Sequence, residues 1–286
     1  MELRLIIQSF VNGISLSLIY VLFALGLTLI MGIFDICNFA YGEFVMVAGF
    51  ITYLVVGKWG LPYVLAPIAA MIAVSLLGIA FEKGIFYPMR NRGGLEPGLA
   101  TFGASGALQT GALLLFGGNP FGVPPIISGN VHIGSIFFAL ENVPVIIGSL
   151  LMVFLLFLFV QRTRFGLAIK ASQQDQEIVA LMGMDIARIR VVVWIVASCL
   201  AAAAGVLLAP ISYVYPFMGT GLLLKGFAVV IMGGFGSIPG ALAGGFVLGL
   251  VDSFGMTFLG TYSYMFAFGF IILVLIFRPQ GLLGKR

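Results

Sequence analysis

The sequence predicts an all-α, polytopic transmembrane helical bundle that contains broken or re-entrant helices and forms a single domain over residues 1–286. Hydrophobic residues make up 61% of the chain and charged residues only 8%, and the mean hydropathy is +1.18. A soluble domain contains about 25% charged residues. The composition therefore excludes a soluble enzyme, a nucleic-acid-binding domain and a disordered chain, and it predicts a lipid bilayer as the surrounding medium.

Nine apolar stretches are candidates for membrane crossings, since a crossing helix needs about 20 mostly apolar residues. They are residues 5–31, 39–57, 61–81, 98–117, 143–161, 191–209, 222–235, 240–258 and 264–277. The first exceeds a simple crossing and could form a hairpin, and the stretch 222–235 is shorter than one. We therefore expect about eight or nine membrane segments. Any broken helix should be buried in protein or line a cavity, because lipid cannot satisfy free backbone polar groups.

Basic residues are concentrated in alternate loops, which predicts the orientation of the bundle. They gather in three segments, 82–97, 162–190 and the C-terminal tail, as Lys83, Arg90, Arg92, Arg162, Arg164, Lys170, Arg188, Arg190, Arg278, Lys285 and Arg286. The alternate loops 118–142, 210–221 and 259–263 carry none. Basic loops usually face the cytoplasm. Nine crossings then place the N-terminus outside and the C-terminus in the cytoplasm.

A short motif occurs twice and marks two predicted helix breaks. Residues 30–34 and 231–235 match at four of five positions, and each motif precedes a turn-like segment and a new apolar helix. Many transporters are built from repeats whose broken helices meet at the substrate site. The match therefore points to the pathway, and chance similarity between Gly-rich membrane segments is the alternative.

The second break has a dense glycine pattern. We expect Gly233-Gly234-Phe235-Gly236-Ser237 to be unwound and to line the pathway. Pro239 suits the first turn of a helix that restarts there. The alternative is close helix packing, because Gly236, Gly240 and Gly244 are spaced by four.

Ionisable residues inside apolar stretches are the next candidates for function. They are Asp35, Glu43, Lys225 and Asp252. A charge at the bilayer centre costs about 2.5–3.5 kcal/mol on insertion scales, so it usually faces protein or water. We expect Glu43 and Asp252 to pair with Lys225 in a charge network that holds the two broken regions together. Snorkelling of Lys225 to the interface and a direct role in the pathway are the alternatives.

The cytoplasmic segment 162–190 is the longest soluble piece. Residues 173–182 read as a short helix with an apolar edge, which Gly183 would end. Such a helix predicts a protein partner, and packing on its own chain or on lipid headgroups is the alternative. The sequence contains no paired carboxylates, Ser-His-Asp set or Cys-His set that would indicate catalysis.

Several of these motifs match a known family. Residues 32–43 fit its Asn-Phe-Ala-His-Gly-Glu element, residues 164–183 its ATPase-coupling element, and residues 225–227 with 233–241 its C-terminal signature. On these motifs the chain resembles the branched-chain amino acid ABC transporter permeases of the LivH type over nearly its whole length. Two details depart from the pattern. Tyr41 replaces the usual His, and Leu167 and Lys170 stand where Arg is frequent.

The resemblance implies the permease fold of an ABC importer in a bacterial or archaeal cytoplasmic (inner) membrane, with a branched-chain or other hydrophobic amino acid as cargo. It implies a homologous second permease, two cytoplasmic ABC ATPases and a soluble extracytoplasmic binding protein as partners, and no nucleic acid. The chain lacks a Walker motif. ATP would therefore be used by the partner ATPases, and no cofactor is expected on this chain.

The resemblance also carries two groups of site residues. The substrate pathway would be lined by Asn38, Tyr41, Glu43, Gly233, Gly234 and Ser237. ATPase coupling would involve Arg164, Gly166, Lys170, Asp175 and Gly183. We expect Lys170→Glu or Gly166→Arg to uncouple the ATPase without unfolding the membrane part.

Three other functions remain open at this point. The same ABC architecture could carry urea, short amides or aromatic acids. A self-sufficient secondary transporter or channel would use the Lys225 network as an ion-linked site. A non-transporting scaffold would leave the intramembrane charges and the cytoplasmic helix without a role.

Overall fold

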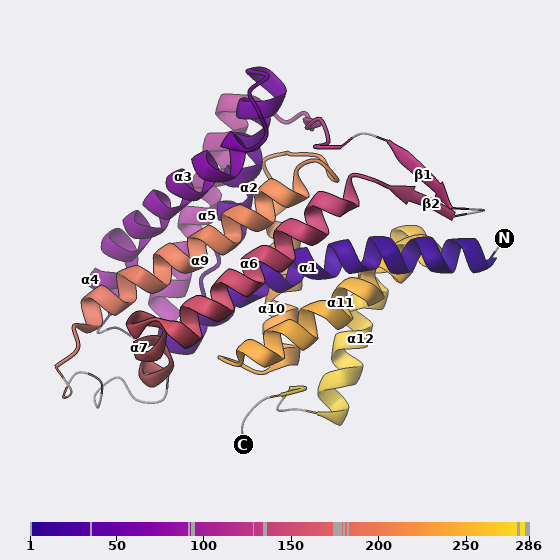
Figure 1. Cartoon of the computed structure of the whole chain (residues 1–286). Coiled ribbons are helices and arrows are strands. Elements are labelled where there is room, and N and C mark those ends of the chain that lie inside the picture. Colours follow the sequence, from indigo (N-terminus) through magenta and orange to yellow (C-terminus); the bar gives the residue numbers. More distant parts are fainter. Residues whose placement is uncertain are drawn as a thin grey trace.

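Long apolar helices build the protein (Figure 1), whose computed structural model describes residues 2–34, 36–90, 92, 95–127, 129–133, 136–173, 179, 181, 183–278 and 281–283. In chain order the elements are α1 (Glu2–Phe34), α2 (Tyr41–Thr52), the π-helix η1 (Tyr53–Lys58), α3 (Leu65–Phe81), the π-helix η2 (Glu82–Phe86), α4 (Tyr87–Met89), α5 (Leu95–Phe116), β1 (Asn130–Ile133), β2 (Ile136–Ala139), α6 (Asn142–Arg162), α7 (Arg164–Ser172), α9 (Ile186–Leu208), α10 (Met218–Gly233), α11 (Ile238–Leu259), the 3₁₀-helix η3 (Gly260–Tyr262) and α12 (Ser263–Phe277). The prediction of an all-α polytopic bundle is confirmed, with one short antiparallel hairpin in the long loop 118–142.

The helices coincide with the nine predicted membrane stretches. Among the described residues, seven helices are long and apolar enough to cross a membrane, and α10 and α12 are shorter apolar helices. α1 is one continuous helix of 33 residues, about 50 Å long at 1.5 Å per residue. The alternative of a hairpin within residues 1–31 is therefore wrong.

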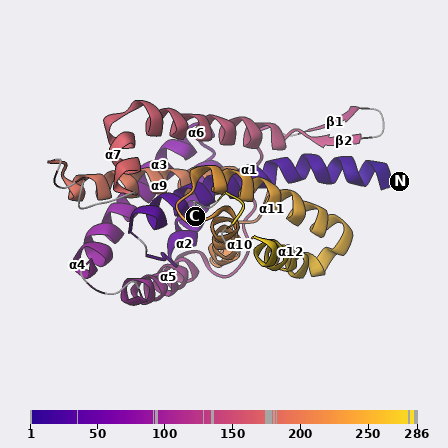
Figure 2. The same cartoon turned by 90° about the horizontal axis from the view of Figure 1, so that it is seen from below.

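α1 forms the centre of the bundle. It packs against α11 along much of its length and also against α9, α6 and α10. In its most apolar window 83% of the residues are buried, compared with 17% in α5 and 22% in α6. Figure 2 shows α6 and α5 on opposite sides of the bundle, with α1 and α9 between them. Both peripheral helices therefore expose long apolar faces.

The two ends of the bundle differ in composition. The N-terminus and the β1–β2 hairpin lie at one end, and α4 and α7 lie at the other (Figures 1 and 2). The second end carries basic residues of the segments 82–97 and 162–190. Most of the helix predicted over 173–182 lies outside the described residues, including Asp175, as does the intramembrane candidate Asp35.

Candidate translocation and coupling sites

The two helix breaks predicted by the repeated motif lie against each other. α1 ends at Phe34 and α10 ends at Gly233, so both motifs close a helix. The last turn of α1 and the turn between α10 and α11 meet so closely that a Cβ on Gly32 would lie 2.9 Å from the Cα of Gly236. The repeat in the sequence therefore marks two turns that touch in space.

The turn between α10 and α11 requires glycine and is tied to the C-terminal residues. Gly234 and Gly236 have φ of 99° and 72°, a region that only glycine enters without strain. Ser237 caps α11 by accepting the N–H of Gly240 at 3.1 Å. The N–H of Leu282 donates to the carbonyl of Met232 at 2.6 Å. Of the stretch 233–237 predicted to be unwound, residues 234–237 are non-helical, whereas Gly233 is the last residue of α10. Residues 281–283 cover the end of α10.

Asn38 and Tyr41 are buried in the turn between α1 and α2. The side-chain oxygen of Asn38 accepts the N–H of Ala40 at 3.0 Å. The Tyr41 hydroxyl donates to the carbonyl of Ala197 at 2.7 Å, and its ring lies 4.9 Å from that of Phe23. Tyr41 therefore packs in the core between α1, α2 and α9 in this conformation.

Glu43 lies in a separate polar cluster between α2, α5 and α10. Its Oε1 accepts hydrogen bonds from Ser105 at 3.1 Å and from Gln109 at 2.7 Å, and Gln109 also donates to Thr220 at 2.9 Å. Glu43 is fully buried, and its Oε2 has no hydrogen-bond partner among the described residues. One oxygen of this carboxylate is therefore bound by two neutral donors, and the other is buried without a partner in the described part of the chain.

Lys225 pairs with only one of its two predicted partners. Its Nζ lies 2.6 Å from the Oδ2 of Asp252 and donates to the Tyr20 hydroxyl at 2.9 Å. The ring of Tyr264 lies 4.7 Å from the same Nζ. The prediction that Glu43 shares this network is wrong, because its carboxylate is bound to α5 instead. Lys225 is 5% exposed, so it forms a buried ion pair and does not snorkel.

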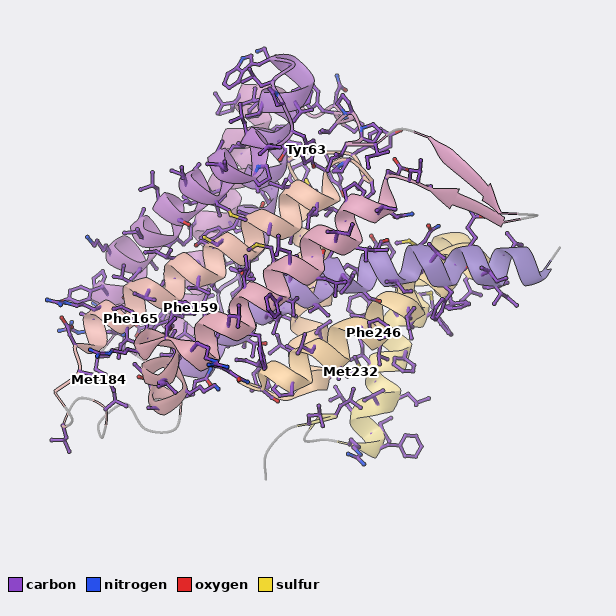
Figure 3. The ribbon with its side chains drawn as sticks, viewed as in Figure 1. Tyr63, Phe159, Phe165, Met184, Met232 and Phe246 are labelled. Atoms are coloured by element: carbon purple, nitrogen blue, oxygen red, sulfur yellow. The ribbon has the colours of Figure 1, made fainter. Side chains whose placement is uncertain are left out.

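The predicted coupling segment begins with α7, which folds back onto the end of α6. Thr163 caps α7 by accepting the N–H of Gly166 at 3.0 Å, and Phe165 lies near the end of α6, where Phe159 is found (Figure 3). A Cβ on Gly166 would collide with the backbone of Val160. The expectation that Gly166→Arg leaves the structure intact is therefore wrong. Gly183 has a φ of 80°, which suits the predicted helix end.

The predicted pathway residues are dispersed in this structure. Glu43 faces α5 and α10, Tyr41 is in the core, and Ser237 lines a cavity on the side of α6. Asn38 lies in the turn beside α5, since the N–H of Phe39 donates to Thr101 at 3.0 Å. One chain does not bring all of them to a common surface.

Residues 9–275 match the family model described as branched-chain amino acid transport system / permease component. The chain belongs to this permease family.

Two permeases named for branched-chain amino acids match nearly the whole chain, and a ribose permease matches part of it. The high-affinity branched-chain amino acid transport system permease protein BraD of Pseudomonas aeruginosa is 34% identical over 98% of this chain and 96% of its own length. The corresponding protein LivH of Escherichia coli is 28% identical over the same shares. The ribose import permease protein RbsC of Escherichia coli is 33% identical over 36% of this chain. No solved structure matches.

The structure of this family member contains polar groups that the sequence did not single out as pairs. Arg190 on α9 binds Glu82 of η2 at 2.8 Å, and the two side chains are 12% and 2% exposed. The guanidinium also lies 4.7 Å from the ring of Phe34. A π-helix, often found at functional sites, begins at Glu82, but its position could not be read from the sequence.

Among the described residues, no three His, Cys, Asp or Glu side chains are grouped so as to hold a metal ion.

Proposed function

We propose that this chain is the transmembrane permease subunit of an ABC importer for branched-chain amino acids. The observation that carries the proposal is the end-to-end match to permeases named for that transport. Since the chain itself has no Walker motif, its energy comes from ATP hydrolysis by partner subunits. The chain binds no cofactor of its own.

The pathway lies between this chain and a homologous second permease, on the face formed by α2, α5 and α10. Two features support this face. The buried Glu43 cluster lies directly behind it, and Gly103, Gly106 and Gly111 of α5 have open space where a Cβ would lie. Small residues let the backbones of two helices approach closely. Asn38 and Glu43 offer polar groups on the side of α5 for a conduit that binds its solute weakly.

α7 and the residues that follow form the docking surface for the ATPases. Phe165 and Leu167 are 46% and 58% exposed. Large apolar side chains that are exposed at the basic end of the bundle are available to a protein partner. Two ATPases dock there, one on each permease. We place this end in the cytoplasm and the hairpin end outside the inner membrane, where a soluble binding protein delivers the substrate.

The alternatives have weaker support. In a self-sufficient transporter, Lys225 and Asp252 would bind a coupling ion, but the two charges already neutralise each other at 2.6 Å. Urea or short amides would suit the same architecture, but the relatives that match nearly the whole chain are named for branched-chain amino acids.

The test is purification of the tagged chain from its native membrane, followed by transport assays. We expect two ATPases and a second permease in the complex, and ATP-dependent leucine uptake in vesicles that also contain the binding protein. Uptake by the chain alone without ATP would overturn the ABC assignment. Uptake of urea without leucine by the intact complex would keep the architecture and overturn the cargo.

A further inference from the structure

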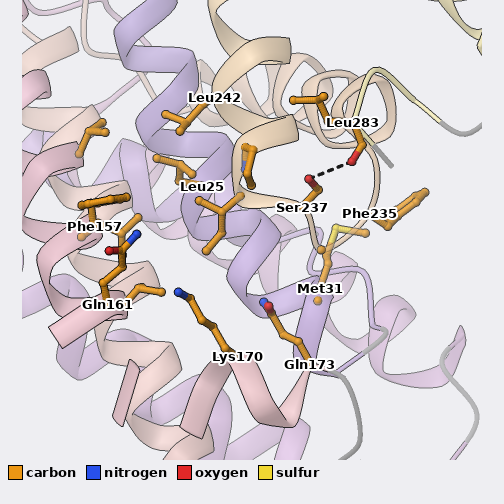
Figure 4. A pocket seen from close by; sticks show the side chains of 17 residues that line it. Leu25, Met31, Phe157, Gln161, Lys170, Gln173, Phe235, Ser237, Leu242 and Leu283 are labelled. Atoms are coloured by element: carbon orange, nitrogen blue, oxygen red, sulfur yellow. Dashed lines mark hydrogen bonds between the residues drawn. The ribbon is translucent and has the colours of Figure 1, made fainter. Parts of the chain in front are cut away.

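A cavity of about 790 Å³ lies between α6 and α11 (Figure 4). α6 and α11 each pack against α1, and residues of α1 form part of the cavity wall between them. The volume is within the range of ligand pockets, roughly 300–1,000 Å³. Phe157 and Phe235, which line the cavity, are 54% and 64% exposed. The cavity is therefore open to the surroundings.

Polar and apolar groups are separated within this cavity. Much of the wall consists of aliphatic side chains, among them Leu25, Val153 and Leu242. Gln161, Lys170 and Gln173 lie together at the end nearest α7 (Figure 4). Such a site suits an amphipathic ligand that has a long apolar part and a polar head.

The polar end favours an anion. Lys170 is exposed and makes no salt bridge within the described part of the chain, and no acidic side chain is among the lining residues. The Nε2 of Gln173 is buried and has no hydrogen-bond partner among the described residues. An ammonium and a free amide donor beside each other form a suitable cradle for phosphate oxygens.

The location of the cavity indicates a ligand that comes from the bilayer. Its walls are two membrane-crossing helices, and only 22% of the apolar window of α6 is buried within the chain. Glu43 is hydrogen-bonded to α5, and α5 and α6 lie on opposite sides of the bundle (Figure 2). A second permease seated on α2, α5 and α10 would therefore leave the cavity facing lipid. Basic pockets between membrane helices on the cytoplasmic side are known to hold anionic headgroups.

We propose that the cavity between α6 and α11 is a binding site for an anionic phospholipid. An acyl chain lies along Leu25, Val153 and Leu242, and the phosphate contacts Lys170 and Gln173. The bound lipid fills the space between α6 and α11, and it stabilises the position of α7 through its contact with Lys170. This role is separate from the transport of substrate.

The experiment measures lipid retention by the purified full chain in detergent, by native mass spectrometry. The probes are phosphatidylglycerol and phosphatidylcholine with identical acyl chains. We expect Lys170→Gln to lower phosphatidylglycerol retention about five-fold, as for the loss of one basic contact, and to leave phosphatidylcholine unchanged. Lys170→Arg should retain the wild-type preference. Val153→Trp, which fills the apolar part, should lower retention of both lipids.

Lys83→Gln is the matched control, since it removes an exposed charge at the same end of the bundle but does not line the cavity. The proposal is overturned if Lys170→Gln and Lys83→Gln have equal effects, or if Val153→Trp retains both lipids at the wild-type level. It is also overturned if inorganic phosphate protects the chain against heat as well as phosphatidylglycerol does. If Lys170→Gln fails to fold, Lys170→Arg and Val153→Trp still decide. The assay involves no transport, so its outcome is independent of the proposed cargo.

Discussion

The Nζ of Lys225 on α10 lies 2.6 Å from the Oδ2 of Asp252 on α11. The hydroxyl of Tyr20 on α1 donates to the same carboxylate oxygen at 2.5 Å. Three helices, one of them too short to be a regular span, are thus joined at a single buried point. The contact explains how a broken region holds its charges inside an apolar bundle.

Lys225→Met should strongly destabilise the protein. Removal of one partner from a buried ion pair leaves an unpaired charge and costs about 3–5 kcal/mol. Thermal unfolding of the purified chain measures the effect. The double variant Lys225→Met with Asp252→Asn should recover part of the loss, which a double-mutant cycle quantifies. Additive effects of the two substitutions would show that the pair contributes no coupling energy.

Arg190→Gln should destabilise the chain by a similar amount, because Glu82 would remain buried without its partner. The matched control is Arg92→Gln. Arg92 pairs with Glu96 at 3.3 Å, but both side chains are more than half exposed, and such surface pairs contribute about 0–1 kcal/mol. Equal melting temperatures for the two variants would contradict the structural role given to the buried pair.

Gly42→Ala should lower both stability and transport. A Cβ at Gly42 would collide with the carbonyl of Gly219, and a Cβ at Gly219 would collide with the carbonyl of Gly42. Overpacking of this kind typically costs about 1–3 kcal/mol. Gly106→Ala on α5 meets nothing within 4 Å and should leave the unfolding temperature of the isolated chain unchanged. An unaffected Gly42→Ala variant would show that α2 and α10 can separate without cost.

Tyr41→Phe should cost about 1 kcal/mol of stability, the typical contribution of one hydrogen bond, because the bond to Ala197 is lost. We expect the substrate profile to stay the same, since the Tyr41 hydroxyl is already used within the chain. Competition between leucine and other amino acids in reconstituted vesicles measures this. A changed order of preference would mean that Tyr41 reaches the substrate in another state of the cycle.

Leu167→Glu should weaken association with the ATPases about ten-fold or more, as expected for a central interface residue. Leu167 is 58% exposed on α7, so its substitution should not change the melting temperature. Co-purification with the ATPases measures the interaction. Tyr213→Glu, on an exposed residue of the loop between α9 and α10, serves as the control. If the Leu167→Glu variant recovered as much ATPase as the wild-type chain, the docking surface would lie elsewhere.

The helices and their breaks could be predicted from the sequence, because apolar length and glycine chemistry are local properties. Gly234 and Gly236 are examples, since their positive φ follows from the turn in which they lie. The pairing of Lys225 with Asp252 could also be predicted, because few oppositely charged residues lie in apolar stretches. The repeated motif marked the positions of both helix breaks, but it did not predict that they are in contact.

Long-range polar contacts were harder to predict. Glu43 binds Gln109, 66 residues away, rather than Lys225, because the packing of α5 against α2 brings neutral donors closer than the ammonium. Arg190 and Glu82 are 108 residues apart, and each looked like an ordinary loop charge. The role of Gly166 was misjudged for the same reason. Its closeness to Val160 depends on the angle between α6 and α7, which no local pattern specifies.

The contact between Gly32 and Gly236 has a mechanical consequence. Neither segment can move toward the other by even the width of a methyl group. When this end opens, the end of α1 and the α10–α11 turn must therefore move together or apart. A pair of spectroscopic labels, one on each segment, should report a distance that stays constant or grows during the transport cycle and never shortens.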